Sequence, residues 1–381
     1  MNRRSCLNIR DLRADETPGG AWRLTARAGS REVAFDAGIP LAPAREAFLQ
    51  AFLFPAMCRS WDLWTDGPLC PRWIENAAHA QELARRWWGF PGGAIHHDGS
   101  EALVPASGQA LLFGGGIDSF YTLRQLRDRL THLIYVEGYD VPLTDAGRLA
   151  RIGEWNRAVA AECGLELVVI RTRLRDHPDF RVLPWINGFG GALAAAGHLL
   201  RDRCGTVWVS AGGYSYKIDR PGLGMHPDLT PLWSSSAVRF VHHGEETLRV
   251  DKAAAVAEWP LARRFLRVCW KSRGSGLNCG VCEKCVRTQL EFFAAGRLDV
   301  LETMPAGPLA ERLDRIPWVS DNVFCYYQDL MARIEEPVLR NAIKALRQRS
   351  LPVQRKLARR DIWERRWKLL RRRLHLPLGG F

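Results

Sequence analysis

The stretch "LLFGGGIDSFYTL", Leu111–Leu123, places an apolar run directly before three glycines, an Asp–Ser pair and the start of a helical pattern. Such a run is typical of a buried strand, and a strand–turn–helix connection leaves the first N–H groups of the helix without partners. Those groups and the helix dipole favour an anion, and glycines let the backbone approach it. The stretch therefore predicts a phosphate-binding turn. The alternative is a tight bend in which Asp118 or Ser119 only caps the helix.

The sequence that follows alternates between strand and helix patterns. Strands are predicted at residues 110–113, 132–138, 165–172 and 206–212, and helices at 119–130, 145–163 and about 188–203. Continuous apolar strands separated by amphipathic helices indicate a parallel sheet with both faces covered. We therefore expect an α/β fold with a doubly wound parallel sheet.

The two ends of the chain have other patterns. A hairpin is predicted at residues 22–27 and 31–35, before two helical segments, and every segment beyond residue 300 has helical spacing. Changes in composition and Gly- and Pro-rich turn stretches then predict four parts: an N-terminal α+β domain at 1–100, the doubly wound domain at 101–260, a cysteine-rich segment at 261–300 and a helical region at 301–381.

Composition favours a globular, non-secreted protein. The chain has 381 residues, of which 47% are hydrophobic and 25% charged, which allows two or three domains. Its amino terminus has no apolar stretch of signal-peptide length. The uncharged run at 182–200 contains a proline and four glycines, so a buried helix is a better interpretation than a membrane span. We expect a cytoplasmic location.

Four of the ten cysteines lie close together, in the spacing C-x9-C-x2-C-x2-C: Cys269, Cys279, Cys282 and Cys285. Four thiolates at short spacing suit a closed tetrahedral Zn²⁺ site with a structural role. An iron–sulfur cluster uses the same four ligands and stays open as an alternative. Because the chain is neither short nor predicted to be exported, metal binding is favoured over a disulfide scaffold.

Two motifs together carry a resemblance to a known family. The turn "GGGIDS", residues 114–119, resembles the S-G-G-x-D-S loop of the PP-loop ATP pyrophosphatases, with Gly114 in place of the first serine. A cysteine-rich segment such as "CGVCEKCVRT", residues 279–288, follows that loop in 7-cyano-7-deazaguanine synthase and its relatives. The resemblance covers residues 108–292, about half of the chain, and implies an adenine nucleotide alpha hydrolase-like fold.

The resemblance also implies a reaction. Such enzymes use ATP and Mg²⁺ to adenylate an oxygen of a small-molecule acceptor, release pyrophosphate and pass the intermediate to a nucleophile. Asp118 would hold Mg²⁺, and Lys252, in "RVDKAAAVAEW", would contact phosphate. Arg287 would contact phosphate or, equally, support the zinc loop. The remaining nucleotide-binding candidates are Gly114, Gly115, Gly116 and Ser119.

Acceptor-site candidates come from the region after the fourth predicted strand. They are Ser210, Tyr214, His226 and Asp228. Arg171 and Arg173, at the end of the third strand, would meet an acidic substrate or form surface ion pairs. Two other functions stay open: a nucleotide-binding module whose loop has lost turnover with the serine at position 114, and a tRNA-modifying PP-loop enzyme.

Nearly all of the net charge lies in the last 42 residues. The formal net charge is +13, and residues 340–381 contribute +12 of it. Trp363, Trp367, Leu370 and Leu374 are spaced as one stripe of an Arg-rich helix. Such a helix suits RNA or an anionic membrane surface, and the alternative is docking on its own domain or on a second subunit of a homo-oligomer.

Overall fold

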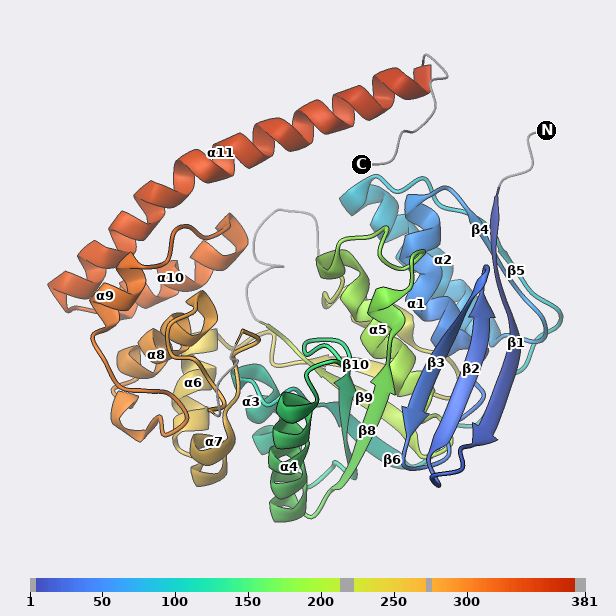
Figure 1. Ribbon diagram of the computed structural model, residues 1–381, viewed down its shortest axis with the longest axis horizontal. Coiled ribbons are helices and arrows are strands. Elements are labelled where there is room, and N and C mark those ends of the chain that lie inside the picture. Colours follow the sequence, from blue (N-terminus) through green and yellow to red (C-terminus); the bar gives the residue numbers. More distant parts are fainter. Residues whose placement is uncertain (1–4, 213–222, 272–275, 374–381) are drawn as a thin grey trace.

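A computed structural model of the chain describes residues 5–212, 223–271 and 276–373. Within these residues, ten strands form one mostly parallel sheet in the order β10-β9-β6-β7-β8-β3-β2-β1-β4-β5 (Figure 1). Helices pack on this sheet, so the α/β class predicted from the sequence is confirmed. None of the helices in the described residues has an apolar stretch long enough to cross a lipid bilayer.

Five parallel strands form the part of the sheet that begins with the glycine turn. They are β6 (Gly108–Leu112), β7 (His132–Glu137), β8 (Glu166–Thr172), β9 (Cys204–Ser210) and β10 (Arg239–His243). The chain runs outward from β6 through β7 to β8, and then returns to the other side of β6 for β9 and β10. The direction of winding therefore reverses between β6 and β9, where ligands bind in doubly wound sheets.

Helices cover both faces of these five strands. One face carries α3 (Ile117–Leu126), α4 (Ala146–Cys163), α6 (Arg249–Ala257) and α7 (Pro260–Phe265), which share a hydrophobic core with β6 and β7. The other face carries α1 (Arg45–Cys58), α2 (Pro71–Trp88) and α5 (Trp185–His198), the predicted buried helix. Figure 1 shows the two groups on opposite sides of the sheet.

The first 100 residues extend the same sheet. The predicted hairpin is present as β2 (Trp22–Ala28) and β3 (Arg31–Ala37), and β3 pairs antiparallel with β8. Sequence patterns missed β1 (Cys6–Glu16), β4 (Asp62–Thr65), β5 (Ile95–His96) and β10. The short strands β4 and β5 depend on pairing with distant segments, which local patterns do not report. The four domain boundaries stay a prediction.

From the last part of the cysteine-rich segment onward, the regular elements are helices. They are α8 (Glu283–Ala294), the 3-10 helix η3 (Leu298–Val300), α9 (Leu309–Asp314), α10 (Asp321–Arg333) and α11 (Pro337–Arg373). Two further 3-10 helices, η1 (Leu174–Asp176) and η2 (Thr230–Trp233), lie earlier in the chain. The start of α11 packs on α9 and α10 through Leu339, Ile343 and Leu346, while its end extends away from these two helices (Figure 1). Its RNA, membrane or subunit partner stays a prediction.

Candidate functional site

The glycine turn leads from β6 into α3 at the carboxyl edge of the sheet. The N–H of Phe113 still donates to the carbonyl of Ile134 in β7, at 2.8 Å, and Gly116 is the N-cap of α3. Gly115 has a φ of +74°, a conformation that glycine adopts without strain. The first N–H groups of α3 lack partners within the helix and face the edge where the sheet reverses direction.

The side chain and backbone of Arg267 hold this turn. The N–H of Arg267 donates to the carbonyl of Gly115 at 2.7 Å, and its Nη2 donates to the carbonyl of Gly114 at 2.8 Å. Arg267 itself is buried. Both carbonyls thereby point at the arginine, which leaves the N–H side of the turn directed away from it.

Asp118, in the first turn of α3, faces two cations from α6. Arg249 donates from Nη1 to Oδ2 of Asp118, and Nζ of Lys252 lies 3.8 Å from Oδ1. Burial raises the pKa of Asp118, but the charges of Arg249, Lys252 and Lys284 outweigh it and hold this pKa below its ordinary value. The carboxyl is therefore ionised at neutral pH.

Lys252 connects the site to the strand on the other side of the switch point. Its side chain is 1% exposed, and Nζ donates to the carbonyl of Ala211, directly after β9, at 2.8 Å. A lysine is almost never this buried unless its charge is compensated. Two predicted site residues, Asp118 and Lys252, therefore meet at the point where the sheet reverses.

A buried ion-pair network lies behind Arg249. Its Nε donates to Glu291 of α8 at 3.0 Å, and Glu291 also accepts from Arg287 at 3.3 Å. Arg287 donates to Glu283 at 2.8 Å, and its guanidinium carbon lies 4.3 Å from the ring centre of Tyr326. Arg287 thus sits one residue behind the cations that face Asp118, next to the cysteine-rich segment.

Three polar atoms near the turn have no hydrogen-bond partner among the described residues: Nη2 of Arg249, Oδ1 of Asp118 and Oγ of Ser210. Ser210 ends β9, and β9 pairs with β6 through Leu111 and Trp208. Leaving a buried polar group unpaired costs about 1–3 kcal/mol. Three such atoms around one turn indicate a site that a polar ligand completes.

The other acceptor candidates lie beyond β9. His226 is buried and packs against Trp87 with 4.7 Å between ring centres and 58° between ring planes, and it accepts from the N–H of Asp228 at 3.1 Å. Asp228 is exposed, and Tyr214 lies outside the described residues. Burial, with the nearby charges of His226, Lys252 and His243, lowers the pKa of His242, in β10, to about 4.

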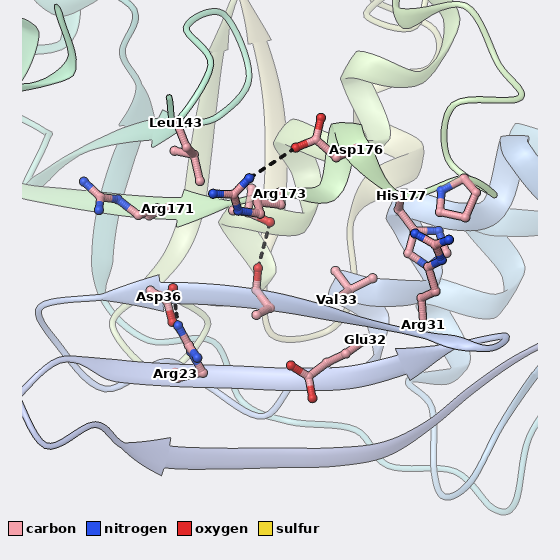
Figure 2. Close-up of a pocket in the computed structure, with 13 residues that line it drawn as sticks. Arg23, Arg31, Glu32, Val33, Asp36, Leu143, Arg171, Arg173, Asp176 and His177 are labelled. Carbon is pink, nitrogen blue, oxygen red and sulfur yellow. Dashed lines mark hydrogen bonds and ion pairs between the residues drawn. The ribbon is translucent and has the colours of Figure 1, made fainter. Parts of the chain in front are cut away.

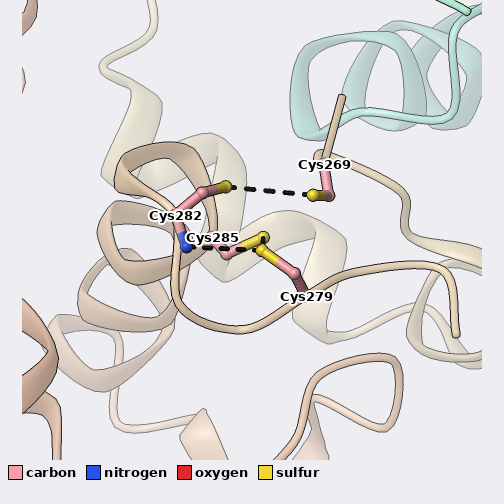
Figure 3. Close-up of side chains that lie close together, drawn as sticks. All are labelled: Cys269, Cys279, Cys282 and Cys285. Carbon is pink, nitrogen blue, oxygen red and sulfur yellow. Dashed lines mark hydrogen bonds between the residues drawn. The ribbon is translucent and has the colours of Figure 1, made fainter. Parts of the chain in front are cut away.

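The four predicted metal ligands lie together (Figure 3). All four sulfur atoms are within 4.8 Å of one another, with 3.8 Å between Cys269 and Cys282 and 3.8 Å between Cys279 and Cys285. Tetrahedral Zn–S bonds of about 2.3 Å separate the sulfurs by about 3.8 Å. The cluster can therefore hold a metal ion such as zinc.

The backbone around the cluster is fixed by specific contacts. Gly280 has a φ of +72°, and a Cβ at this position would lie 2.4 Å from Pro305, so only glycine fits. Oδ1 of Asn278 accepts from the N–H groups of Val268 and Cys269, at 2.9 and 3.0 Å. Arg148 of α4 donates to the carbonyl of Cys269 at 3.0 Å, which ties the segment to the sheet domain.

A separate cavity of about 560 Å³ lies where β3 joins β8 (Figure 2). Arg171 and Arg173, which were predicted to meet an acidic substrate or to form surface ion pairs, line it. Arg171 lies 2.8 Å from Glu137, and Arg173 lies 3.9 Å from Asp176. Both arginines therefore have carboxylate neighbours within the chain.

One further cysteine has acid–base neighbours, at the opposite edge of the sheet. The sulfur of Cys204 lies 3.4 Å from Nδ1 of His132, whose Nε2 lies 3.3 Å from Glu166. Burial and the charge of Glu166 raise the pKa of Cys204 to about 12. A thiol that stays protonated is a poor nucleophile.

Sequence reasoning missed Arg249, Arg267 and Glu291. Arg249 is in the quoted segment with Lys252, and its position one helical turn earlier places both on the same face of α6. That spacing could have revealed it. Arg267 gave no such signal, because its contact with Gly114 spans 153 residues.

Comparison of the chain with protein-family models, curated proteins and solved structures finds no significant match.

Proposed function

We propose that this protein is an ATP-dependent enzyme that adenylates an oxygen of a small-molecule acceptor and releases pyrophosphate. The observation that carries the proposal is the meeting of the glycine turn, Asp118 and Lys252 at the switch point of a doubly wound sheet. Ligands of such sheets bind at that point, and a helix N-terminus with adjacent cations suits phosphate.

The chain's own residues divide the work between them. The turn residues Gly115 and Gly116 and the start of α3 would bind the pyrophosphate part of ATP through N–H groups. Lys252 and Arg249 would neutralise its charge, and the unpartnered Nη2 of Arg249 has a donor to spare. Ser119 already donates to the carbonyl of Gly116 at 3.0 Å, so it shapes the turn.

Mg²⁺ would enter with ATP and neutralise charge on the phosphate oxygens. The residue that fits it is Asp118, whose Oδ1 has no hydrogen-bond partner in the described part of the chain. Arg249 contacts the other oxygen, Oδ2, so this contact can stay or weaken when Oδ1 binds the ion. The phosphates offer Arg249 an alternative anionic partner, so its charge stays compensated.

In the proposed reaction, a carboxylate oxygen of the acceptor attacks the α-phosphorus of ATP. The bond between the α-phosphorus and the bridging oxygen breaks, and pyrophosphate leaves with that oxygen. Catalysis then consists of positioning and charge neutralisation by the turn, Lys252 and Arg249. Displacement of AMP by a nitrogen nucleophile would give an amide, as in the 7-cyano-7-deazaguanine synthase-like family. Ser210, at the end of β9, and His226 would contact the acceptor.

We further propose that the cysteine cluster binds Zn²⁺ in a structural role. All four ligands come from the protein, which leaves a tetrahedral ion no open position for substrate. The sulfur separations match one central ion, whereas in a [4Fe–4S] cluster each thiolate binds a different iron and the sulfurs are farther apart.

The test is pyrophosphate release from ATP by purified, zinc-loaded protein with a panel of carboxylate acceptors. The proposal expects release that requires both Mg²⁺ and Asp118. A nucleotide-binding module without turnover would bind ATP in a titration and release no pyrophosphate with any acceptor. That outcome would reject the proposed enzyme activity in favour of nucleotide binding alone.

A further inference from the structure

We infer that the metal centre sets the conformation of the glycine turn, and that Arg267 is the positioning residue that joins the two. The inference rests on the proposed function only for what the turn binds. The contact itself stands on hydrogen bonds of the described residues, and it predicts a change in the turn that is measurable without any nucleotide.

The first link runs through three consecutive residues. Arg267 donates to the carbonyls of Gly115 and Gly114 at 2.7 and 2.8 Å. The next two residues, Val268 and Cys269, donate their N–H groups to Asn278, and Cys269 is itself a cluster ligand. The segment that grips the turn is therefore anchored to the metal centre within two residues.

Asn278 closes this link from the other side of the cluster. It directly precedes the ligand Cys279, and its Nδ2 donates to the carbonyl of Leu266 at 2.8 Å. The side chain is buried. One side-chain amide therefore holds the backbone on both sides of Arg267. A metal ion bound to Cys269 and Cys279 would hold the segments that carry these two ligands together.

The second link runs through α8. This helix starts at Glu283, between the ligands Cys282 and Cys285, and carries Glu291 in its next turns. Glu291 accepts from Arg249, which in turn donates to Asp118. Both sides of the candidate anion site, the turn and the cations, are thus supported by segments that carry metal ligands.

Loss of the metal would free these segments. The four cysteine sulfurs lie within 4.8 Å of one another, and without an ion no coordinate bond joins the segments that carry them. The segment of Arg267 would then move, and Gly114 and Gly115 would lose their two hydrogen bonds. We expect the first turn of α3, which starts from this loop, to open more often.

Amide hydrogen exchange tests the inference on the full chain without nucleotide. The peptide that covers Phe113–Leu123 reports the turn, and the β2–β3 hairpin is the internal reference. Chelation of the metal should raise exchange about tenfold at the amides that depend on the turn, such as Phe120, whose N–H donates to the carbonyl of Gly116 at 2.9 Å. The hairpin should stay unchanged.

Variants separate Arg267 from general destabilisation. Metal-loaded Arg267→Gln loses the side-chain bond to Gly114 and keeps the backbone bond to Gly115, so exchange in the turn should be faster than in the wild type, by less than after chelation, while the metal stays bound. Arg267→Lys should restore part of the protection. Arg264→Gln is the matched control, because Arg264 lies nearby on α7 and forms an exposed pair with Glu162. It should behave as the wild type does.

Wild-type exchange in Arg267→Gln would overturn the inference, as would a turn that keeps its protection after chelation. If chelation also exposes the hairpin, the chain has unfolded as a whole, and the metal-loaded variant decides alone. ATP titration is a separate readout: coupling between metal and turn without ATP binding would reject the proposed function and leave the inference standing.

Discussion

The ammonium nitrogen of Lys252 lies 3.8 Å from Oδ1 of Asp118, beside the glycine turn and at the point where the sheet reverses its winding. The same nitrogen donates to the carbonyl of Ala211 at the end of β9. One lysine therefore touches both sides of the switch point. Its positive charge therefore lies next to the position that an anion bound at the start of α3 would take.

Replacement of this lysine should weaken nucleotide binding more than it weakens the fold. In Lys252→Met, Asp118 keeps its contact with Arg249, while a bound anion loses a buried cation. Truncating one partner of a buried charge pair costs about 2–5 kcal/mol, so we expect ATP affinity to fall by about 30-fold or more. Calorimetric titration measures it. Lys344→Met, at an exposed position of α11, is the control, and equal affinities in the two variants would refute the role of Lys252.

Removal of one cluster ligand should cost the protein its metal and much of its stability. We expect Cys285→Ser to lose most of the bound metal and to unfold at a lower temperature, because binding energy at a structural site is folding energy. Metal analysis and thermal unfolding measure the two effects. Cys163→Ser changes a buried cysteine outside the cluster and should keep the metal. Full metal content in Cys285→Ser would contradict the four-ligand site.

The missing serine of the turn can be restored without strain. A Cβ on Gly114 meets no atom within 4 Å, and its φ is not positive, so Gly114→Ser should change the free energy of unfolding by less than about 1 kcal/mol. The new hydroxyl should donate to phosphate and raise ATP affinity several-fold. Gly115→Ser is the contrast, because a φ of +74° strains a serine by about 1–2 kcal/mol. Unchanged or weaker ATP binding by Gly114→Ser would speak against phosphate at this position.

Acid should destabilise the protein through His198. Burial lowers the pKa of this imidazole, which contacts the carbonyl of Trp233, to about 4. Since the unfolded chain has an ordinary pKa near 6.5, it binds the proton first, and stability is lost as the pH falls from about 6.5 towards 4. The contribution is about 3 kcal/mol. Denaturant unfolding at several pH values should show that the free energy of unfolding falls less steeply with decreasing pH in His198→Gln than in the wild type. His79→Gln, on the exposed face of α2, should follow the wild type. The same dependence of the free energy of unfolding on pH in His198→Gln and in the wild type would contradict the role given to His198.

The sequence predicted those elements whose signal lies within one continuous segment. The run from β6 through the turn to α3 is contiguous, and three of the four cysteines of the cluster lie within one short segment. The strand β10 was missed because its alternation is short and its partner β9 is distant in sequence. Neither Arg267 nor Glu291 could be predicted, since each acts through contacts with residues more than 40 positions away.

Pyrophosphate release from ATP, measured for the wild type and for Asp118→Asn with and without Mg²⁺, tests the central claim most directly. Asparagine keeps the shape of Asp118 and removes its charge, and zinc content and thermal unfolding confirm that the variant is folded. The proposed function predicts release by the wild type with a carboxylate acceptor, and a loss of about 100-fold or more in Asp118→Asn or without Mg²⁺. Equal release by Asp118→Asn, or ATP binding without release across the acceptor panel, would contradict it.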